Sequence, residues 1–314
     1  MNTPTPRTDG EPRAVVIGHG AVGALVTALM AKAGWSALSV DRADHTGDSA
    51  GILHGDITDP TPTLRGELAR ADVVVVAIPE QAAVDGLGTI AAATGPRTTI
   101  VETLSHKSGF LDKAETLLDP RPVLSLNPLF HPSLGWAGNT VTASAVRAGD
   151  TAERLLTLIE GAGARVHRLS HEEHDHVVTS VQAVTHAALL SFVDAVRRLG
   201  LAPVDLVACA PPPTRALLAL SARVLTSQTE TYWDIQNSGP PGGDARRALA
   251  ESLQALEAGV DAGDRDGFGE TFAGLGIWLG ENLDPFADDA ARALKTLLNR
   301  PTDSDDPAHD RRTR

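Results

Sequence analysis

The sequence has little cysteine, no excess of positive charge and no long apolar run. Cys209 is the single cysteine among 314 residues, so no internal disulfide can form, which favours a reducing compartment such as the cytoplasm. The formal net charge of −13 argues against nucleic acid or an anionic membrane as the main partner, because both attract basic surfaces. The start of the chain lacks the apolar core of a signal peptide, and no apolar run approaches the roughly 20 residues that span a bilayer. We therefore expect a cytoplasmic protein with neither nucleic acid nor membrane as a partner.

The chain does contain enough apolar material for a sizeable core. Hydrophobic residues make up 42% of the 314 residues, which predicts a globular protein of two domains. Segments 1–12 and 301–314 are rich in Pro, Asp, Thr and Arg, and we expect both to be disordered tails.

The hydrophobic pattern changes once along the chain, near residue 170. Before it, short apolar runs alternate with helical patterns, which predicts a parallel sheet covered by helices. The expected strands are 14–17, 37–40, 73–78, 98–101, 122–126, 140–143 and 165–169, with a weaker candidate at 51–55. The helical patterns that follow are at about 172–199, 203–208, 214–226, 229–237, 244–262, 265–281 and 285–298, with a break at S-G-P-P-G-G, 238–243. We expect an α/β domain at 13–170 and an all-α domain at 171–300.

A glycine-rich loop, G-H-G-A-V-G, follows the first expected strand and opens a helix. In the pattern G-x-G-x-x-G, Gly18 permits a tight turn, Gly20 lets a pyrophosphate approach the backbone, and Gly23 allows close helix–strand packing. The flanking strand and helix make this a Rossmann-type dinucleotide site. The loop residues expected to contact the cofactor are Gly18, His19, Gly20, Ala21, Val22 and Gly23.

The second expected strand ends at Asp41, about 20 residues after the loop. A carboxylate there accepts hydrogen bonds from both ribose hydroxyls and repels a 2′-phosphate, so the sequence favours NAD. Arg42 beside it leaves NADP open as the alternative. Ile78 and Pro79 follow the next long apolar run, and we expect them to border the nicotinamide crevice.

The stretch S-H-E-E-H-D-H, 170–176, invites a metal-site interpretation because of its histidines and acids. Helix capping explains it better: Ser170 caps a helix and Glu173 completes a capping box. We therefore expect no metal.

For two features of the helical domain, the sequence does not decide between a structural role and a functional role. Gln182 and His186 lie four residues apart on one helical face, where a histidine is more often a satisfied core residue than a site. Arg215 begins a helix, where the helix dipole disfavours a cation. It either holds a carboxylate or is simply solvated.

Together these motifs resemble the prephenate dehydrogenase (TyrA) family over roughly residues 13–298. Besides the glycine loop they are E-T-L-S-H-K-S-G (102–109), V-L-S-L-N-P-L-F-H-P (123–132), E-E-H-D-H…S-V-Q-A-V-T-H (172–186), P-P-T-R (212–215) and Y-W-D-I-Q-N (232–237). The resemblance implies a Rossmann domain and a helical domain that forms a homodimer. It also implies NAD-dependent oxidation of a cyclohexadiene acid, with loss of CO₂, to an arylpyruvate.

The resemblance also assigns roles to individual residues. Ser105 matches the family's serine near the C4 substituent of the substrate, and His186 matches its helical active-site histidine. Arg215 matches the arginine that binds a substrate carboxylate. Gln182 and Lys107 are further candidates for substrate binding, and Lys107 either touches the substrate or only orders the loop after its strand.

The main departure from the family lies in L-S-L-N-P-L-F-H-P-S-L-G-W, 124–136. Asn127 stands where the family has its catalytic histidine, and His131 stands where the family pattern has its second glycine. If C4 carries a hydroxyl, a histidine base helps to remove the O–H proton and is typically worth ~10²–10⁴ in rate. An asparagine amide cannot take that proton. If C4 carries an amino group, the nitrogen lone pair expels hydride and leaves an iminium without any base.

The sequence therefore predicts a substrate that resembles 4-amino-4-deoxyprephenate, giving 4-aminophenylpyruvate in specialised metabolism such as antibiotic biosynthesis. One alternative is a prephenate or arogenate dehydrogenase whose base is displaced to His131 or His106. Others are an imine reductase running the reverse hydride transfer and a catalytically inactive NAD-binding homologue.

Overall fold

The computed structural model describes residues 11–43 and 51–298, so most of both expected tails lies outside the described residues. The chain forms two compact units. The sheet unit takes in the chain up to Ser180 together with Trp233–Pro241, and the helical unit takes in Val181–Tyr232 and the chain from Gly242 onward. The boundary expected near residue 170 falls before a short helix, His171–His174, that belongs with the sheet unit.

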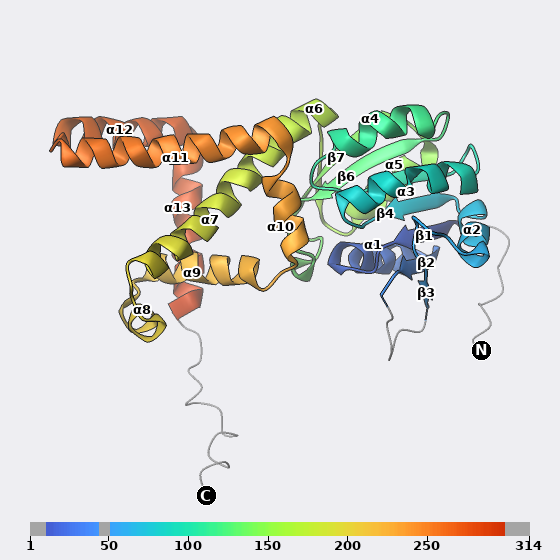
Figure 1. Cartoon of the computed structure of the whole chain (residues 1–314), viewed down its shortest axis with the longest axis horizontal. Helices are drawn as coiled ribbons and strands as arrows, with labels where there is room; N and C mark the ends of the chain where they lie inside the picture. The colour runs from blue at the N-terminus through green and yellow to red at the C-terminus, as the bar shows by residue number, and fades with distance from the viewer. Residues whose placement is uncertain (1–10, 44–50, 299–314) are drawn as a thin grey trace, which may run out of the picture. The chain divides into compact units, whose positions relative to one another are not determined.

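The sheet unit is built on one eight-stranded sheet of order β3-β2-β1-β4-β5-β6-β7-β8 (Figure 1). The strands are β1 (Arg13–Ile17), β2 (Ser36–Asp41), β3 (Ile52–His54), β4 (Val73–Val76), β5 (Thr99–Glu102), β6 (Val123–Pro128), β7 (Thr140–Arg147) and β8 (Arg165–Arg168). Every apolar run expected to be a strand forms one, including the weak candidate at 51–55.

The sheet is not wholly parallel, which corrects the sequence prediction. Strand β7 runs antiparallel to β6, whereas the other neighbouring pairs are parallel. The link between β6 and β7 contains only a 3₁₀ turn, Pro132–Leu134. A parallel connection needs a crossover of about a dozen residues or more, usually a helix. The carboxyl ends of β1, β4, β5 and β6 still share one edge of the sheet.

Helices cover both faces of the sheet, as Figure 1 shows. Side chains of α1 (Ala21–Lys32) and α5 (Asp150–Gly161) belong to the core on one face. Those of α2 (Pro62–Ala69), α3 (Glu80–Ala93) and α4 (Ser108–Leu117) belong to the core on the other face. The central strands therefore need apolar residues at every position, and all four residues of β4 are buried valines.

The remaining part of the described chain is helical. Its elements are α6 (His171–His174), a π-helical turn (Asp175–Thr179), α7 (Ser180–Arg198), α8 (Pro203–Cys209), α9 (Pro212–Leu225), α10 (Thr229–Gln236), α11 (Gly239–Asp261), α12 (Arg265–Leu279), a 3₁₀ turn (Gly280–Asn282) and α13 (Leu283–Leu298). The expected break at 238–243 is wrong beyond Ser238, because α11 begins at Gly239. Pro240 and Pro241 lie in its first turn, where a missing N–H leaves no helical carbonyl unpaired.

One helical run exceeds the apolar length expected from the sequence. Among the described helices, the run His171–Arg198 is long and apolar enough, by length and composition alone, to cross a bilayer. Its first turns carry His174 and Asp175, whose buried side chains bond to groups of the sheet unit. Such polar anchoring is that of a helix packed within a protein, so the composition of this run does not establish a membrane span.

Candidate functional site

The glycine loop lies at the carboxyl end of β1. Gly18 has φ +98°, and a Cβ there would lie 2.2 Å from the carbonyl oxygen of Ala77. A Cβ on Gly23 would lie 1.9 Å from the carbonyl oxygen of Gly18. Gly20, the N-cap of α1, differs because a Cβ there meets nothing within 4 Å. The loop therefore leaves open space at a helix N-terminus, where a phosphate can approach the backbone.

Asp41, the last residue of β2, is joined to this loop. Its Oδ2 accepts the backbone N–H of His19 at 2.6 Å, and its Oδ1 accepts that of Ala43 at 2.8 Å. The side chain of His19 pairs with Ser39 at 3.0 Å. Asp41 thereby joins the end of β2 to the glycine loop. These residues fit a dinucleotide.

The other expected cofactor residues surround the loop. Ala21 is exposed at the start of α1, and Val22 packs against the core. Arg42 is exposed beside Asp41. Ile78 lies against Gly18, and Pro79 is the N-cap of α3.

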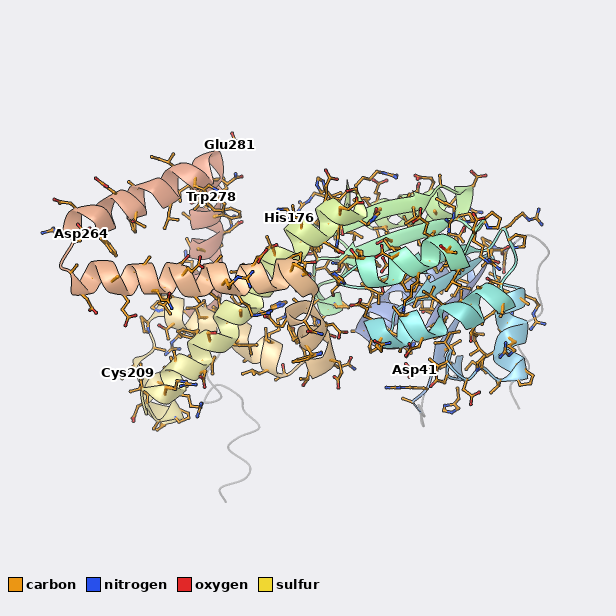
Figure 2. The ribbon with its side chains drawn as sticks, turned by 45° about the horizontal axis from the view of Figure 1, so that its top comes forward. Asp41, His176, Cys209, Asp264, Trp278 and Glu281 are labelled. Carbon is orange, nitrogen blue, oxygen red and sulfur yellow. The ribbon has the colours of Figure 1, made fainter. Side chains whose placement is uncertain are left out.

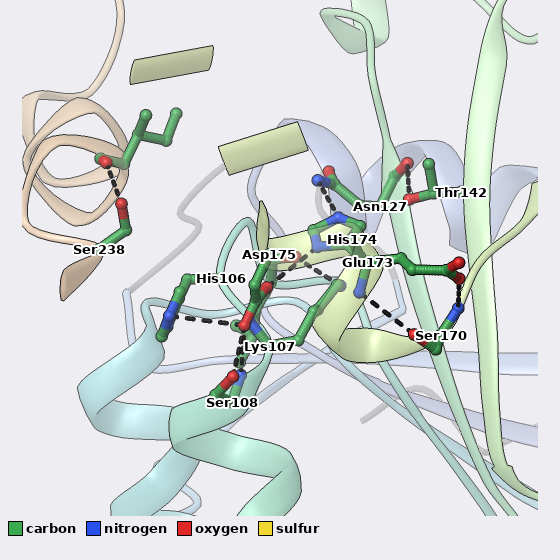
Figure 3. A network of polar contacts seen from close by, with 12 residues as sticks. His106, Lys107, Ser108, Asn127, Thr142, Ser170, Glu173, His174, Asp175 and Ser238 are labelled. Carbon is green, nitrogen blue, oxygen red and sulfur yellow. Dashed lines mark hydrogen bonds and ion pairs between the residues drawn. The ribbon is translucent and has the colours of Figure 1, made fainter. Parts of the chain in front are cut away.

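Asn127 lies at the end of β6, at the same edge of the sheet as the glycine loop. Its side chain is buried, and its Nδ2 lies 3.1 Å from Nε2 of His174 on α6 (Figure 3). The other ring nitrogen of His174, Nδ1, lies 3.1 Å from Oδ1 of Asp175. The Asn127 amide and the His174 imidazole thus lie side by side, and the imidazole does not occupy the position of the amide.

Sequence reasoning missed His174 and Asp175 as site residues. It interpreted their segment as a helix start, which is correct for Ser170 and Glu173: each side chain accepts the backbone N–H of the other residue. The one signal available was the position of E-E-H-D-H among the family motifs. No group of three or more His, Cys, Asp or Glu side chains within residues 11–43 and 51–298 could hold a metal ion.

Asp175 organises the polar groups around Asn127 (Figure 3). Its carboxylate accepts the backbone N–H groups of Lys107 and Ser108, each at 2.9 Å, and the Ser108 hydroxyl at 2.6 Å. Burial alone would raise the pKa of Asp175. Hydrogen bonds from His174 and Ser108 outweigh burial, however, and hold that pKa well below its ordinary value. Asp175 is therefore an ionised acceptor.

The two imidazoles beside Asp175 are perturbed in opposite directions. The pKa of His174 is lowered, chiefly because burial disfavours its charged form, although Asp175 opposes that effect. The pKa of His106 is raised, chiefly by its hydrogen bond to Glu80, with Asp175 adding to the shift. At neutral pH His174 is therefore neutral.

The sequence left two roles open for Lys107, substrate binding or ordering of the loop after its strand, and its contacts favour the second. Its side chain is 1% exposed, and its ammonium donates to Glu102 and to the carbonyls of Leu104 and Leu126. Because an ammonium has three hydrogens, none is left for a substrate. Lys107 instead orders the loop after β5 and ties it to the residue that precedes Asn127.

The two remaining candidates of the sheet unit have few polar contacts. His131 is exposed and caps the turn Pro132–Leu134, because its Nδ1 accepts the backbone N–H of Ser133 at 3.2 Å. Ser105 is half-buried, and its hydroxyl has no hydrogen-bond partner among the described residues. The proposed roles of both stay predictions.

In the helical unit, α7 carries two buried polar atoms that have no hydrogen-bond partner among the described residues. They are Oε1 of Gln182 and Nδ1 of His186, one turn apart. The His186 ring meets Tyr232 edge-on at 4.8 Å, and burial lowers the pKa of His186. A buried polar atom without a partner costs about 1–3 kcal/mol, so these atoms are well suited to receive a ligand's hydrogen bonds.

Arg215 lies in the first turn of α9 and is exposed. Its guanidinium donates to the carbonyl oxygens of Ala210 at 3.1 Å and Val207 at 3.4 Å. A guanidinium has five N–H donors, so Arg215 keeps donors for a carboxylate.

Three comparisons place these observations among known proteins. Residues 170–274 match the model of the prephenate dehydrogenase dimerization domain. A 4-amino-4-deoxyprephenate dehydrogenase from Streptomyces pristinaespiralis is 36% identical over 269 residues, which cover 85% of this chain and 91% of that protein. The T-protein of Haemophilus influenzae is 23% identical, over 90% of this chain and 70% of that protein.

The fold also matches solved structures. Prephenate dehydrogenase from A. aeolicus, in complex with hydroxyphenyl propionate and NAD⁺, aligns with a TM-score of 0.68 at 16% identity. The alignment covers 86% of this chain and 98% of that one. The Rossmann sheet and the helical elements after it therefore form a known combination.

Proposed function

Because the chain belongs to the prephenate dehydrogenase family, we propose that it catalyses the NAD-dependent oxidative decarboxylation of a prephenate-type cyclohexadiene acid to an arylpyruvate. The favoured substrate is 4-amino-4-deoxyprephenate, which gives 4-aminophenylpyruvate. The observation that carries this choice is Asn127, a buried amide at the sheet edge where the family has a histidine. The relative at 36% identity is named for the same amino substrate. A role in specialised metabolism, such as antibiotic biosynthesis, follows from that substrate.

The glycine loop and Asp41 hold the cofactor in this proposal. Amides at the start of α1 bind the pyrophosphate, and the carboxylate of Asp41 accepts the ribose hydroxyls and disfavours a 2′-phosphate. NAD⁺, when bound, supplies the acceptor for the hydride that leaves C4 of the ring.

Asn127 provides a hydrogen-bond acceptor for the C4 amino group and takes no proton from it. As hydride leaves C4, the nitrogen lone pair forms a C=N bond, and the ring becomes a conjugated iminium. Loss of CO₂ from C1 then returns two electrons to the ring, which becomes aromatic with a neutral amino group. No base is needed in either step, which fits a site built around an amide.

The groups that hold the substrate's acids and ring come from residues with unused hydrogen-bonding capacity. We assign a substrate carboxylate to Arg215 and further polar contacts to Gln182, His186 and Ser105. Ion pairs between a guanidinium and a carboxylate are often bidentate, which orients the substrate as well as binding it.

We propose that the protein acts as a homodimer through the helical unit. Residues 170–274 match a dimerization domain, and helices α11–α13 expose many large apolar side chains. Phe272, Ile277 and Trp278 on α12 are 74%, 79% and 81% exposed. Figure 2 labels Trp278 on this helix. Monomeric proteins rarely leave such a surface uncovered. The cytoplasmic setting expected from the single cysteine stays a prediction.

The displaced-base alternative is disfavoured for His106. Its raised pKa, caused first by Glu80, makes its ring cationic over more of the neutral range, and a cation accepts no proton. His131 is exposed and engaged with Ser133.

A substrate panel tests the proposal. The protein is incubated with NAD⁺ or NADP⁺ and each of prephenate, arogenate and 4-amino-4-deoxyprephenate, and the absorbance of the reduced cofactor is followed. We expect the fastest turnover with 4-amino-4-deoxyprephenate and NAD⁺. Faster turnover of prephenate would refute the choice of substrate, and cofactor binding without turnover would identify an inactive homologue.

A further inference from the structure

We propose that His174 is a positioning residue that fixes which end of the Asn127 amide faces the substrate, so that the site offers an acceptor and not a donor to the C4 nitrogen. The inference rests on the proposed function. It assigns a specificity role to a residue that acts through Asn127.

The chain of hydrogen bonds starts from the protein backbone. The amides of Lys107 and Ser108 and the Ser108 hydroxyl all donate to Asp175, at 2.9, 2.9 and 2.6 Å. These donors leave the Asp175 carboxylate ionised, and an ionised carboxylate can only accept. Its neighbour His174 must therefore place a hydrogen on Nδ1, which lies 3.1 Å from Oδ1.

The second link is the imidazole. His174 is 2% exposed, and burial lowers its pKa, so the ring is neutral and carries one N–H. With that hydrogen on Nδ1, the Nε2 atom is a bare acceptor. The group 3.1 Å from it is Nδ2 of Asn127, which donates.

The third link is the amide itself. Because the NH₂ end of Asn127 is committed to His174, its carbonyl oxygen is directed to the other side. Within residues 11–43 and 51–298, the side-chain hydrogen bond of Asn127 is the one to His174, and it uses Nδ2 and not the oxygen. The oxygen is therefore available to an N–H of the substrate. An amide turned by half a rotation would instead present N–H to the C4 nitrogen. A donor there would bind the same lone pair that must expel hydride, and the reaction would slow.

Two substitutions separate the two ring nitrogens of His174. The amide of His174→Gln reaches the position of Nε2 and can still accept from Asn127, whereas that of His174→Asn reaches only the position of Nδ1. We expect His174→Gln to keep kcat for the amino substrate within about threefold. We expect His174→Asn and His174→Phe to lower that kcat about 10- to 100-fold, the range for misplaced polar groups, with little change in NAD affinity.

A role limited to packing predicts a different result. It would lower turnover of the amino substrate and of prephenate by the same factor, and His174→Gln would be no better than His174→Asn. Either result, with unfolding temperatures close to that of the wild type, overturns the inference. If the wild type itself fails to prefer the amino substrate, it is the proposed function that fails.

Nuclear magnetic resonance reads the hydrogen-bond polarity directly, without turnover. In protein labelled with ¹⁵N in its 11 histidines, the His174 signals are those lost in His174→Gln. We expect a neutral ring with hydrogen on Nδ1 at neutral pH. A hydrogen on Nε2 would mean that the ring donates to the Asn127 oxygen, which would overturn the inference whatever the substrate.

Discussion

The Nδ2 atom of Asn127 and the Nε2 atom of His174 lie 3.1 Å apart, although 47 residues separate them in the chain. Asn127, which stands at the family's histidine position, is therefore in contact with the imidazole of His174. Asp175 holds that imidazole in turn. The site retains a histidine, and in the proposed binding mode Asn127 lies between that histidine and the substrate's C4 substituent. In that position the imidazole can orient the amide, and it cannot serve directly as a base.

Asn127→His should restore chemistry on a hydroxyl substrate. We expect turnover of prephenate to rise at least about tenfold, because a histidine base is typically worth ~10²–10⁴. The larger ring also meets His174, so the unfolding temperature should fall. Steady-state kinetics and thermal unfolding measure both effects, with Asn127→Ala as the control that lacks a base. An unchanged prephenate rate in a folded, NAD-binding variant would contradict the prediction.

Gly20→Ala and Gly23→Ala should separate cofactor binding from folding. A Cβ on Gly20 enters open space, so the free energy of unfolding should stay within about 1 kcal/mol while the Kd for NAD rises about tenfold. A Cβ on Gly23 would clash with the Gly18 carbonyl, so that variant should unfold more easily. Calorimetric titration and chemical denaturation distinguish the two. Equal NAD affinity in Gly20→Ala and the wild type would show that phosphate binds elsewhere.

Lys107→Met should lower the free energy of unfolding and should leave the KM for the substrate unchanged. Removing one partner of a buried ion pair costs about 3–5 kcal/mol, because Glu102 would be left charged and buried. The double variant Lys107→Met with Glu102→Leu should recover part of that loss. Urea unfolding measures each step. If Lys107→Met raised KM with no loss of stability, Lys107 would contact substrate after all.

His106 should make stability depend on pH near neutrality. Its folded-state pKa is raised, chiefly by Glu80, so its contribution is present below the unfolded value of about 6.5 and is lost as pH rises through the folded value. The wild type should therefore lose this contribution as the pH rises above about 6.5, and His106→Gln should not. Unfolding free energies across that range test this, with exposed His176→Gln as the matched control. Parallel pH curves for the wild type and His106→Gln would refute it.

Arg215→Ala should weaken substrate binding and leave NAD affinity unchanged. Loss of a charge-assisted pair is worth about 1.5–3 kcal/mol, which is roughly a 10- to 150-fold rise in KM. Arg223→Ala, at another exposed arginine of α9, is the control. A similar effect from both substitutions would point to general charge and not to a specific site.

Much of the fold was predictable because local patterns encode it. Apolar runs of four to eight residues found all eight strands, and glycine spacing located a loop whose Gly18 and Gly23 admit no Cβ. The capping box at Ser170 and Glu173 was also readable, because both partners lie within one helical turn.

The sequence by itself determined the strands, the helices, the glycine loop and the place of Asn127 at the end of a strand. Each of these depends on residues close together in the chain. Only the tertiary structure decided the reversed direction of β7, the burial of Lys107 and the pairing of Asn127 with His174. Those features join segments that are far apart in the chain. A local sequence pattern does not predict them, because it does not indicate which distant side chain will form a hydrogen bond with a buried polar group.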